Sequence, residues 1–166
     1  MRTFSKKLRG FTLVELLVVI AIIGLLSTLA VVSLNSARGK ARDAKRLADI
    51  RQVQTGLELY YQNAATPGYP AGASLVLGAA AGAKLCDAGG TTIGFVATGT
   101  TCTGSTLMGS VPSAPTPFDA PCLVAQNAYT YNQTGSGTGY TLTYCLGATT
   151  SNVSAGTHTA TEAGIQ

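Results

Sequence analysis

The sequence predicts an α+β fold, in which one long N-terminal helix packs on a small antiparallel β head. Three observations support this prediction. Residues 16–34 form an uncharged, mainly aliphatic run, and apolar side chains then recur at helical spacing as far as residue 63. Residues 64–166 hold 16 of the 20 glycines and all four cysteines. With 166 residues, the chain has room for one domain or at most two.

The charged residues are segregated along the chain. Residues 1–58 carry ten basic and four acidic side chains, whereas residues 59–166 carry only one basic and three acidic ones. Charged residues make up 11% of the chain and hydrophobic residues 46%. The apolar fraction argues against a disordered chain. Because the head has no basic patch, direct nucleic-acid binding is not expected.

The apolar run of residues 16–34 is long enough to span a membrane. As a helix it measures about 28 Å, close to the bilayer core of about 30 Å. A buried core helix is the alternative, but the run is long for one. Both flanks are basic, so the positive-inside rule does not decide the orientation. The cysteines all follow the run and indicate disulfides, which places the C-terminus outside the cytoplasm.

Glu15 is an acidic residue at the head of this apolar run, where a partner of opposite charge is expected. The alternative is a carboxylate solvated by lipid headgroups. A cut after Gly10 would create a free amine on Phe11, four residues before Glu15. The helix dipole repels an amine at this end, and the Glu15 carboxylate would relieve that repulsion.

Residues 6–17, K-K-L-R-G-F-T-L-V-E-L-L, closely resemble the class III signal sequence of type IV prepilins and pseudopilins. The resemblance implies that prepilin peptidase cuts between Gly10 and Phe11 and that Phe11 is then N-methylated. It also implies that Glu15 pairs with the Phe11 amine of a neighbouring subunit. The expected divisions are a leader (1–10), a transmembrane and filament-core helix half (11–34), an amphipathic helix half (35–63) and a disulfide-stapled β head (64–166).

The function implied by the resemblance is that of a structural subunit of a type IV pilus-like filament. Expected partners are further copies of the chain in a homopolymer, the prepilin peptidase and methyltransferase, the pilus assembly platform and motor, and membrane lipid before assembly. The chain would cross the inner (cytoplasmic) membrane once, with its C-terminus outside the cytoplasm, and then join an extracellular filament.

Several alternatives stay open beside this reading. Within the family they are a pseudopilin of a type II secretion system and a minor or competence pilin. Outside it, the alternative is a membrane-anchored adhesin that does not polymerise. An ordinary secretory signal, cleaved near Ala30 or Ala37, conflicts with Glu15 inside its apolar core.

Beyond the apolar run, the helical pattern predicts one helix from about residue 12 to residue 63. Its second half is expected to pack on the head through Ile50, Val53, Leu57 and Tyr61.

The basic run of residues 38–51 is expected to be a solvated helix face. The expected internal pairs are Asp43 with Lys40 or Arg46, and Asp49 with Arg46. Contact with acidic groups of neighbouring subunits is the alternative.

In the head, the strongest strand patterns are residues 128–133 and 140–146, joined by a Gly- and Ser-rich turn. Residues 93–97 are predicted as a short strand and residues 153–160 as an edge strand. Residues 71–83 are predicted as a loop with up to one helical turn.

The four cysteines, Cys86, Cys102, Cys122 and Cys145, allow three pairings, among which the sequence does not choose. The local pairing joins the first two and the last two, and the predicted hairpin would bring the last two together. No C-x-x-C spacing exists for zinc.

Asp119 lies in a Pro-rich loop, where some heads of the resembled family bind calcium. One carboxylate is little for a cation that takes six to eight oxygens. The sequence offers no nucleophile–base set and no acid pair, so we expect no metal, no cofactor and no enzymatic activity.

Overall fold

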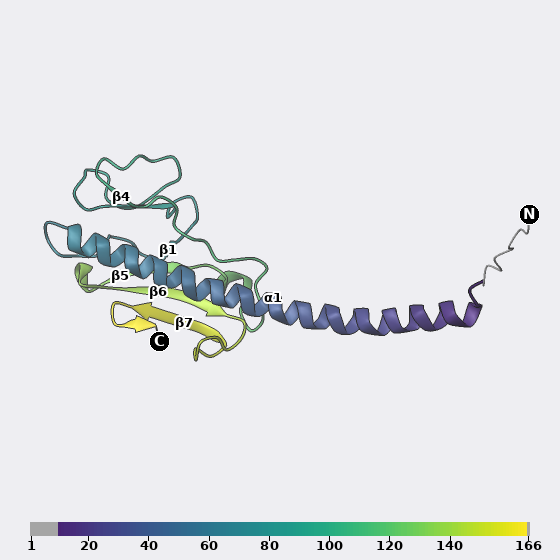
Figure 1. Cartoon of the computed structure of the whole chain (residues 1–166). Helices are drawn as coiled ribbons and strands as arrows, with labels where there is room; N and C mark the ends of the chain where they lie inside the picture. Colours follow the sequence, from purple (N-terminus) through teal and green to yellow (C-terminus); the bar gives the residue numbers. More distant parts are fainter. Residues whose placement is uncertain (1–9, 166) are drawn as a thin grey trace, which may run out of the picture. The chain divides into compact units, whose positions relative to one another are not determined.

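The computed structural model of the chain describes residues 10–165 and confirms the predicted fold class (Figure 1). A long N-terminal helix is combined with antiparallel sheets and two disulfides. The chain separates into two compact units, Met1–Arg38 and Gly39–Gln166. The elements are α1 (Leu13–Asn63), β1 (Leu75–Val76), β2 (Lys84–Cys86), β3 (Gly94–Val96), β4 (Thr106–Met108), η1 (Val124–Gln126), β5 (Thr130–Thr134), η2 (Gly135–Gly137), β6 (Gly139–Leu146), β7 (Gly156–Thr161) and β8 (Gly164–Ile165).

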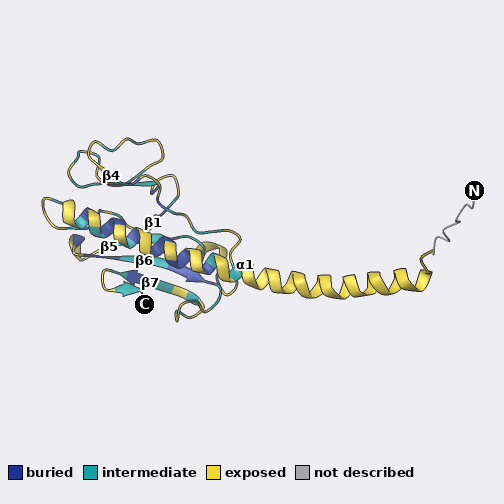
Figure 2. Ribbon diagram, in the orientation of Figure 1, coloured by how far each residue is buried: buried dark blue, intermediate teal, exposed yellow. Residues whose placement is uncertain are grey.

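Helix α1 continues without a break over 51 residues, as the periodicity predicts. No proline occurs before Pro67, so nothing interrupts the backbone hydrogen bonds of the helix. Every residue from 11 to 38 is exposed (Figure 2). Within the first unit, the apolar side chains of α1 therefore have no protein cover in the single chain.

The second half of α1 supplies one wall of the core of the head. Leu47, Ile50, Val53 and Leu57 are buried, at the three- and four-residue spacing of one helix face. Gly56 lies on the same face, and a Cβ added there would come within 2.5 Å of the sulfur of Met108. Of the two neighbouring tyrosines, Tyr60 is the fully buried one, whereas Tyr61, named in the prediction, is only partly buried.

A five-stranded antiparallel sheet, in the order β1-β5-β6-β7-β8, forms the opposite wall. Strands β5 and β6 make the predicted hairpin, with Gln133 opposite Tyr140. The intervening 3-10 turn η2 holds Ser136 at a positive φ of 55°. Buried side chains from this region complete the core, namely Tyr129, Tyr131, Tyr140, Leu142, Tyr144 and Leu146.

Two predictions for the head are wrong in detail. Residues 153–160 do not end the sheet, because β7 pairs with β6 on one side and β8 on the other. Residues 71–83 are not all loop, because β1 pairs with β5. Both β1 and β8 are two residues long, too short to show an alternating pattern.

A second sheet, in the order β3-β2-β4, covers part of α1 and was not predicted apart from β3. Each of its strands has three residues. The disulfide between Cys86 and Cys102 closes this region, and a second disulfide joins Cys122 to Cys145 at the end of β6. These are the local pairs among the three possible connectivities.

Candidate functional site

The predicted processing and assembly residues lie at the start of α1. Residues 1–9 of the expected leader fall outside the described part of the chain. Gly10 is exposed, and a Cβ added there would meet nothing within 4 Å. The side chain of Phe11 is 80% exposed. The two residues on either side of the expected cut are thus both exposed.

Glu15 is bonded to the first turn of its own helix. Its Oε2 atom accepts hydrogen bonds from the backbone N–H of Thr12, at 2.8 Å, and from the Thr12 hydroxyl, at 2.6 Å. The backbone N–H of Glu15 donates to Thr12 Oγ1 at 3.2 Å. This reciprocal arrangement is a capping box, which satisfies N–H groups that have no partner inside the helix.

Thr12 is the functional residue that the sequence reasoning missed. The signal was present as T-x-x-E directly before an apolar run. In the single chain, Glu15 thus has a partner without any second subunit. A neighbouring amine would have to share this carboxylate with Thr12 or take it over.

The apolar surface that follows Glu15 is continuous. Helix α1 is long and apolar enough to cross a membrane, with a mean hydropathy of 2.8 over an 18-residue window that is not buried at all. Exposed large apolar side chains extend from Phe11 to Leu34. A surface of this kind is stable in lipid or against other apolar helices, but not in water.

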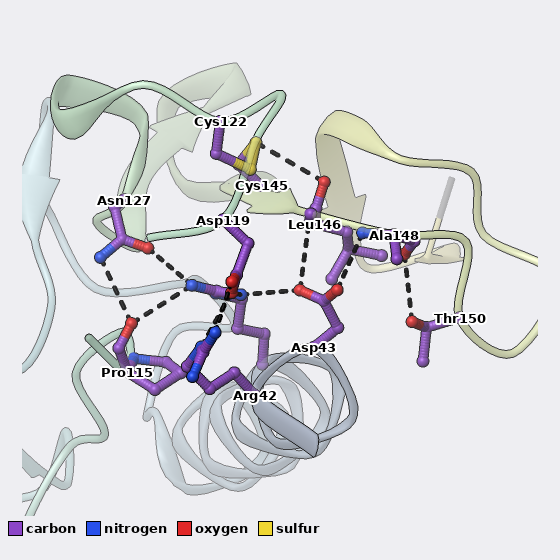
Figure 3. Close-up of polar contacts among 12 residues, drawn as sticks. Arg42, Asp43, Pro115, Asp119, Cys122, Asn127, Cys145, Leu146, Ala148 and Thr150 are labelled. Carbon is purple, nitrogen blue, oxygen red and sulfur yellow. Dashed lines mark hydrogen bonds and ion pairs between the residues drawn. A yellow bond between two sulfur atoms is a disulfide. The ribbon is translucent and has the colours of Figure 1, made fainter. Parts of the chain in front are cut away.

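A second polar cluster connects α1 to the loop before β5 (Figure 3). Asp119 accepts hydrogen bonds from Nε of Arg42 at 2.8 Å and from Nη2 of the same guanidinium. It also lies 3.4 Å from Nη1 of Arg46. The Arg42 guanidinium is the main reason why the pKa of Asp119 lies below its usual value, and burial of the carboxyl partly offsets this effect.

Arg46 is the buried centre of this cluster. Its Nη1 donates to Asp43 at 2.6 Å, and its Nη2 donates to the carbonyl oxygen of Pro115 at 3.2 Å and to Asn127 Oδ1 at 2.9 Å. Asp43 in turn accepts backbone N–H bonds from Gly147 at 3.0 Å and Ala148 at 2.8 Å. The Asp43–Arg46 pair is confirmed.

The expectation of a solvated face is wrong for three residues of the basic run: Asp43, Arg46 and Asp49 are buried. The expected pairing of Asp49 with Arg46 is also wrong, since Asp49 accepts its bond from the Tyr129 hydroxyl at 3.0 Å. Burial raises the pKa of Asp49, and the Tyr129 bond opposes this rise. Sequence reasoning treated the run as a surface because charged side chains are seldom buried.

Asp119, the residue considered above for calcium binding, belongs to the same cluster. The Asp119 carboxylate contacts the guanidinium groups of Arg42 and Arg46. Within residues 10–165, no three His, Cys, Asp or Glu side chains lie close enough together to hold a metal ion. The cluster therefore joins α1 to the loop through arginine.

Comparison with known proteins agrees with the N-terminal geometry. Residues 5–31 match the prokaryotic N-terminal methylation motif. The chain is similar to type II secretion system core protein G of Escherichia coli strain K12, with 44% identity over 56 residues. That match covers 34% of this chain and 39% of the relative.

Two further relatives carry the same description. The protein of Dickeya chrysanthemi is 40% identical over 56 residues, which are 34% of this chain and 37% of the relative. That of Pectobacterium carotovorum subsp. carotovorum is 42% identical over 52 residues, which are 31% and 33%. The chain thus spans less than two-fifths of the length of these relatives. No solved structure matches.

The methylation motif is followed by the long apolar helix α1 and by the disulfide-bonded antiparallel head. The chain thus carries the prokaryotic N-terminal methylation motif at residues 5–31 and is similar to type II secretion system core protein G over about a third of its length.

Proposed function

We propose that the chain is a structural subunit of a type IV pilus-like filament and polymerises through the first half of α1. The observation that carries this proposal is the exposed apolar surface of α1, which begins at the methylation motif. Lipid covers this surface before assembly, and the helices of neighbouring copies cover it in the filament. Exchange of lipid for helix–helix contact conserves apolar burial, so side-chain packing and polar pairs decide the association.

Processing precedes assembly in this proposal. Prepilin peptidase removes residues 1–10 by cutting between Gly10 and Phe11, and Phe11 is N-methylated. Residues 11–34 then form the membrane and filament-core half, residues 35–63 the amphipathic half and residues 64–166 the head. The Phe11 amine of one subunit pairs with Glu15 of its neighbour, which fixes the register between helices.

The two disulfides support an orientation with the head outside the cytoplasm, because such bonds persist in oxidising compartments. The chain crosses the inner membrane once and leaves it when the assembly platform and motor draw it into the filament. No enzymatic activity is assigned to the head.

A pseudopilin of a type II secretion system is the second candidate. The three relatives named above are all described as type II secretion system core protein G, which favours this candidate over a minor or competence pilin. The two functions share processing and helix-driven assembly and differ in whether the filament reaches the cell surface.

Replacement of Glu15 tests the assembly step. Glu15→Val removes both the capping box and the proposed pair, whereas Thr12→Val removes only the threonine part of the cap. Loss of an N-cap costs about 1 kcal/mol. We expect Glu15→Val to insert into membranes but to yield at least about tenfold less filament in sheared fractions, and Thr12→Val to stay close to the parent chain.

Normal filament yield from Glu15→Val would contradict the pairing. An equal loss in both variants would show that the cap, rather than a pair between subunits, is what assembly needs. Electron microscopy of the sheared material separates the two candidates: surface filaments that contain the chain support a pilus, and a processed chain without surface filaments supports a pseudopilin.

A further inference from the structure

The loop of residues 116–126, here called the base loop, is unusually apolar and exposed for a head surface. Phe118 is 44% exposed, Leu123 64% and Val124 73%. Asp119 is the one charged residue in the loop, and it is bound to Arg42 and Arg46. The surface of the base loop therefore presents apolar side chains without a free carboxylate.

Two contacts join the base loop to other elements, and two lie within the loop. Cys122 is bonded to Cys145 in β6, and the Cys122 N–H donates to the Asp119 carbonyl oxygen at 2.9 Å. The Leu123 N–H donates to Gln126 Oε1 at 2.8 Å, and Asp119 is tied to the arginines of α1. Leu123 and Val124 thus lie between bonded residues of the loop, and both are exposed.

The base loop contacts α1 close to the end of the proposed membrane-spanning run. A Cβ added to Gly39 would lie 3.6 Å from Asp119 Oδ1, so the loop packs beside Gly39. Gly39 follows Leu34, the last residue of the apolar run, by five positions. Five residues span at most about 18 Å, so Gly39, which the base loop contacts, lies within that distance of the end of the apolar run.

Basic residues of α1 follow the apolar run closely. Lys40 and Lys45 are exposed, while the acidic residues Asp43 and Asp119 are bound to arginine. Positive charge next to exposed apolar side chains is the composition that binds an anionic lipid surface, at about 1 kcal/mol for each basic residue near it.

We propose that the base loop rests on the membrane that anchors α1, with Phe118, Leu123 and Val124 among the lipid headgroups and Lys40 and Lys45 beside anionic lipid. The proposal rests on the membrane-anchored stage of the proposed function. Lipid is favoured over a second copy, because the short tether keeps Gly39 and its contact loop near the bilayer for as long as α1 is anchored in it. Extraction of the subunit would free the same surface.

The chain has no tryptophan, so a single Trp reports its own surroundings. Val124→Trp places a reporter in the base loop. Ile93→Trp is the matched control, since Ile93 is also apolar and 50% exposed. Ile93 shares a pocket with residues 64–69, which follow the other end of α1. Asn63, the last residue of α1, lies about 32 Å along the helix from Arg42.

Each variant of the full chain is placed in nanodiscs at one copy per disc, with anionic lipids brominated near the headgroup. We expect bromine to quench Trp at position 124 at least about twofold more than Trp at position 93. We also expect Lys40→Gln with Lys45→Gln to reduce that quenching, as a contribution from anionic lipid requires.

Equal quenching at both positions, or none at position 124, would overturn the proposal. Protection of Trp at position 124 that appears only with several copies per disc would assign the base loop to a second copy instead, and would also overturn it. Failure of the chain to enter the discs at all would count against the membrane-anchored stage and hence against the proposed function.

Discussion

Arg46 carries a positive charge into the interior of the head, and three residues and one backbone carbonyl surround its guanidinium. Asp43 and Asp119 supply the opposite charge, and Asn127 and the Pro115 carbonyl oxygen accept further bonds. A buried ion pair contributes little net stability compared with apolar side chains, but removal of one partner leaves a charge without compensation. The cluster therefore fixes which loop meets α1 more than it adds to the stability of the fold.

Asp119→Asn is expected to lower the free energy of unfolding by about 1–3 kcal/mol, because two arginines lose a charged acceptor. Urea unfolding of the full chain in detergent, followed by tyrosine near-UV circular dichroism, measures this loss. Glu162→Gln is the control, since its contact in the head is a 3.5 Å bond from the Tyr140 N–H. A cost no larger than that of the control would contradict the role of the cluster.

The same variant has a defined pH dependence. The folded pKa of Asp119 is lowered, mainly by Arg42, so its stabilisation is complete above the unfolded value of about 4. It is lost as the pH falls below that value, through the lowered folded pKa. The pKa of Asp49 is raised by burial, so Asp49 acts in the opposite direction on acidification. Asp119→Asn should therefore lose less stability between pH 5 and pH 2 than the parent chain does.

Calcium should have no effect on the same loop. Both Asp119 oxygens bond to arginine, which leaves no carboxylate oxygen for a cation without loss of those bonds. We expect neither added calcium nor a chelator to move the urea midpoint of the full chain. A midpoint that rises with calcium and falls with the chelator would contradict this account.

At the scale of elements, the two disulfides act on different parts of the head. Cys86–Cys102 closes the small sheet, with a sequence separation of 16, and Cys122–Cys145 joins the base loop to β6, with a separation of 23. In the chain-entropy model, each contributes about 3 kcal/mol. Only the second is joined to the loop that carries Asp119.

Because only one disulfide is joined to the base loop, we expect the cost of Asp119→Asn to depend on which disulfide is present. Asp119→Asn should cost at least about 0.5 kcal/mol less in a background where Cys122 and Cys145 are serine than in one where Cys86 and Cys102 are serine, because the freed base loop no longer holds Asp119 at Arg42. The two double-mutant cycles, measured by urea unfolding, check this. Equal costs in both backgrounds would show that the loop keeps its place without the disulfide.

The sequence predicted the elements that have long, regular patterns. Helix α1 and the β5–β6 hairpin extend over many residues, so periodicity and turn composition identify them. The three-residue strands β2 and β4 were missed because strands this short carry no period.

The residues of the candidate site also divide into those that a local pattern identifies and those that it does not. Gly10, Phe11 and Glu15 stand together in one motif and can be read locally. The bond between Arg42 and Asp119 joins residues 77 positions apart, which no local pattern reveals.

At the scale of the whole molecule, the chain joins two units that are stable in different surroundings. Residues 11–38 are exposed and mainly apolar, whereas the unit from Gly39 onward has its own core and both disulfides. One part requires lipid or other helices, and the other is a water-exposed domain. The proposed function uses this difference: the first unit is placed in the membrane and then in the filament core, and the second forms the head.

The proposed function requires cleavage between Gly10 and Phe11, because cleavage there leaves α1 attached to the head. The intact mass of the chain recovered from membranes or filaments measures this. We expect a chain that begins at Phe11 and carries one additional methyl group, and a Gly10→Leu variant that keeps residues 1–10. A parent chain that keeps its first ten residues, or one that begins after the apolar run near Ala30 or Ala37, would contradict the account.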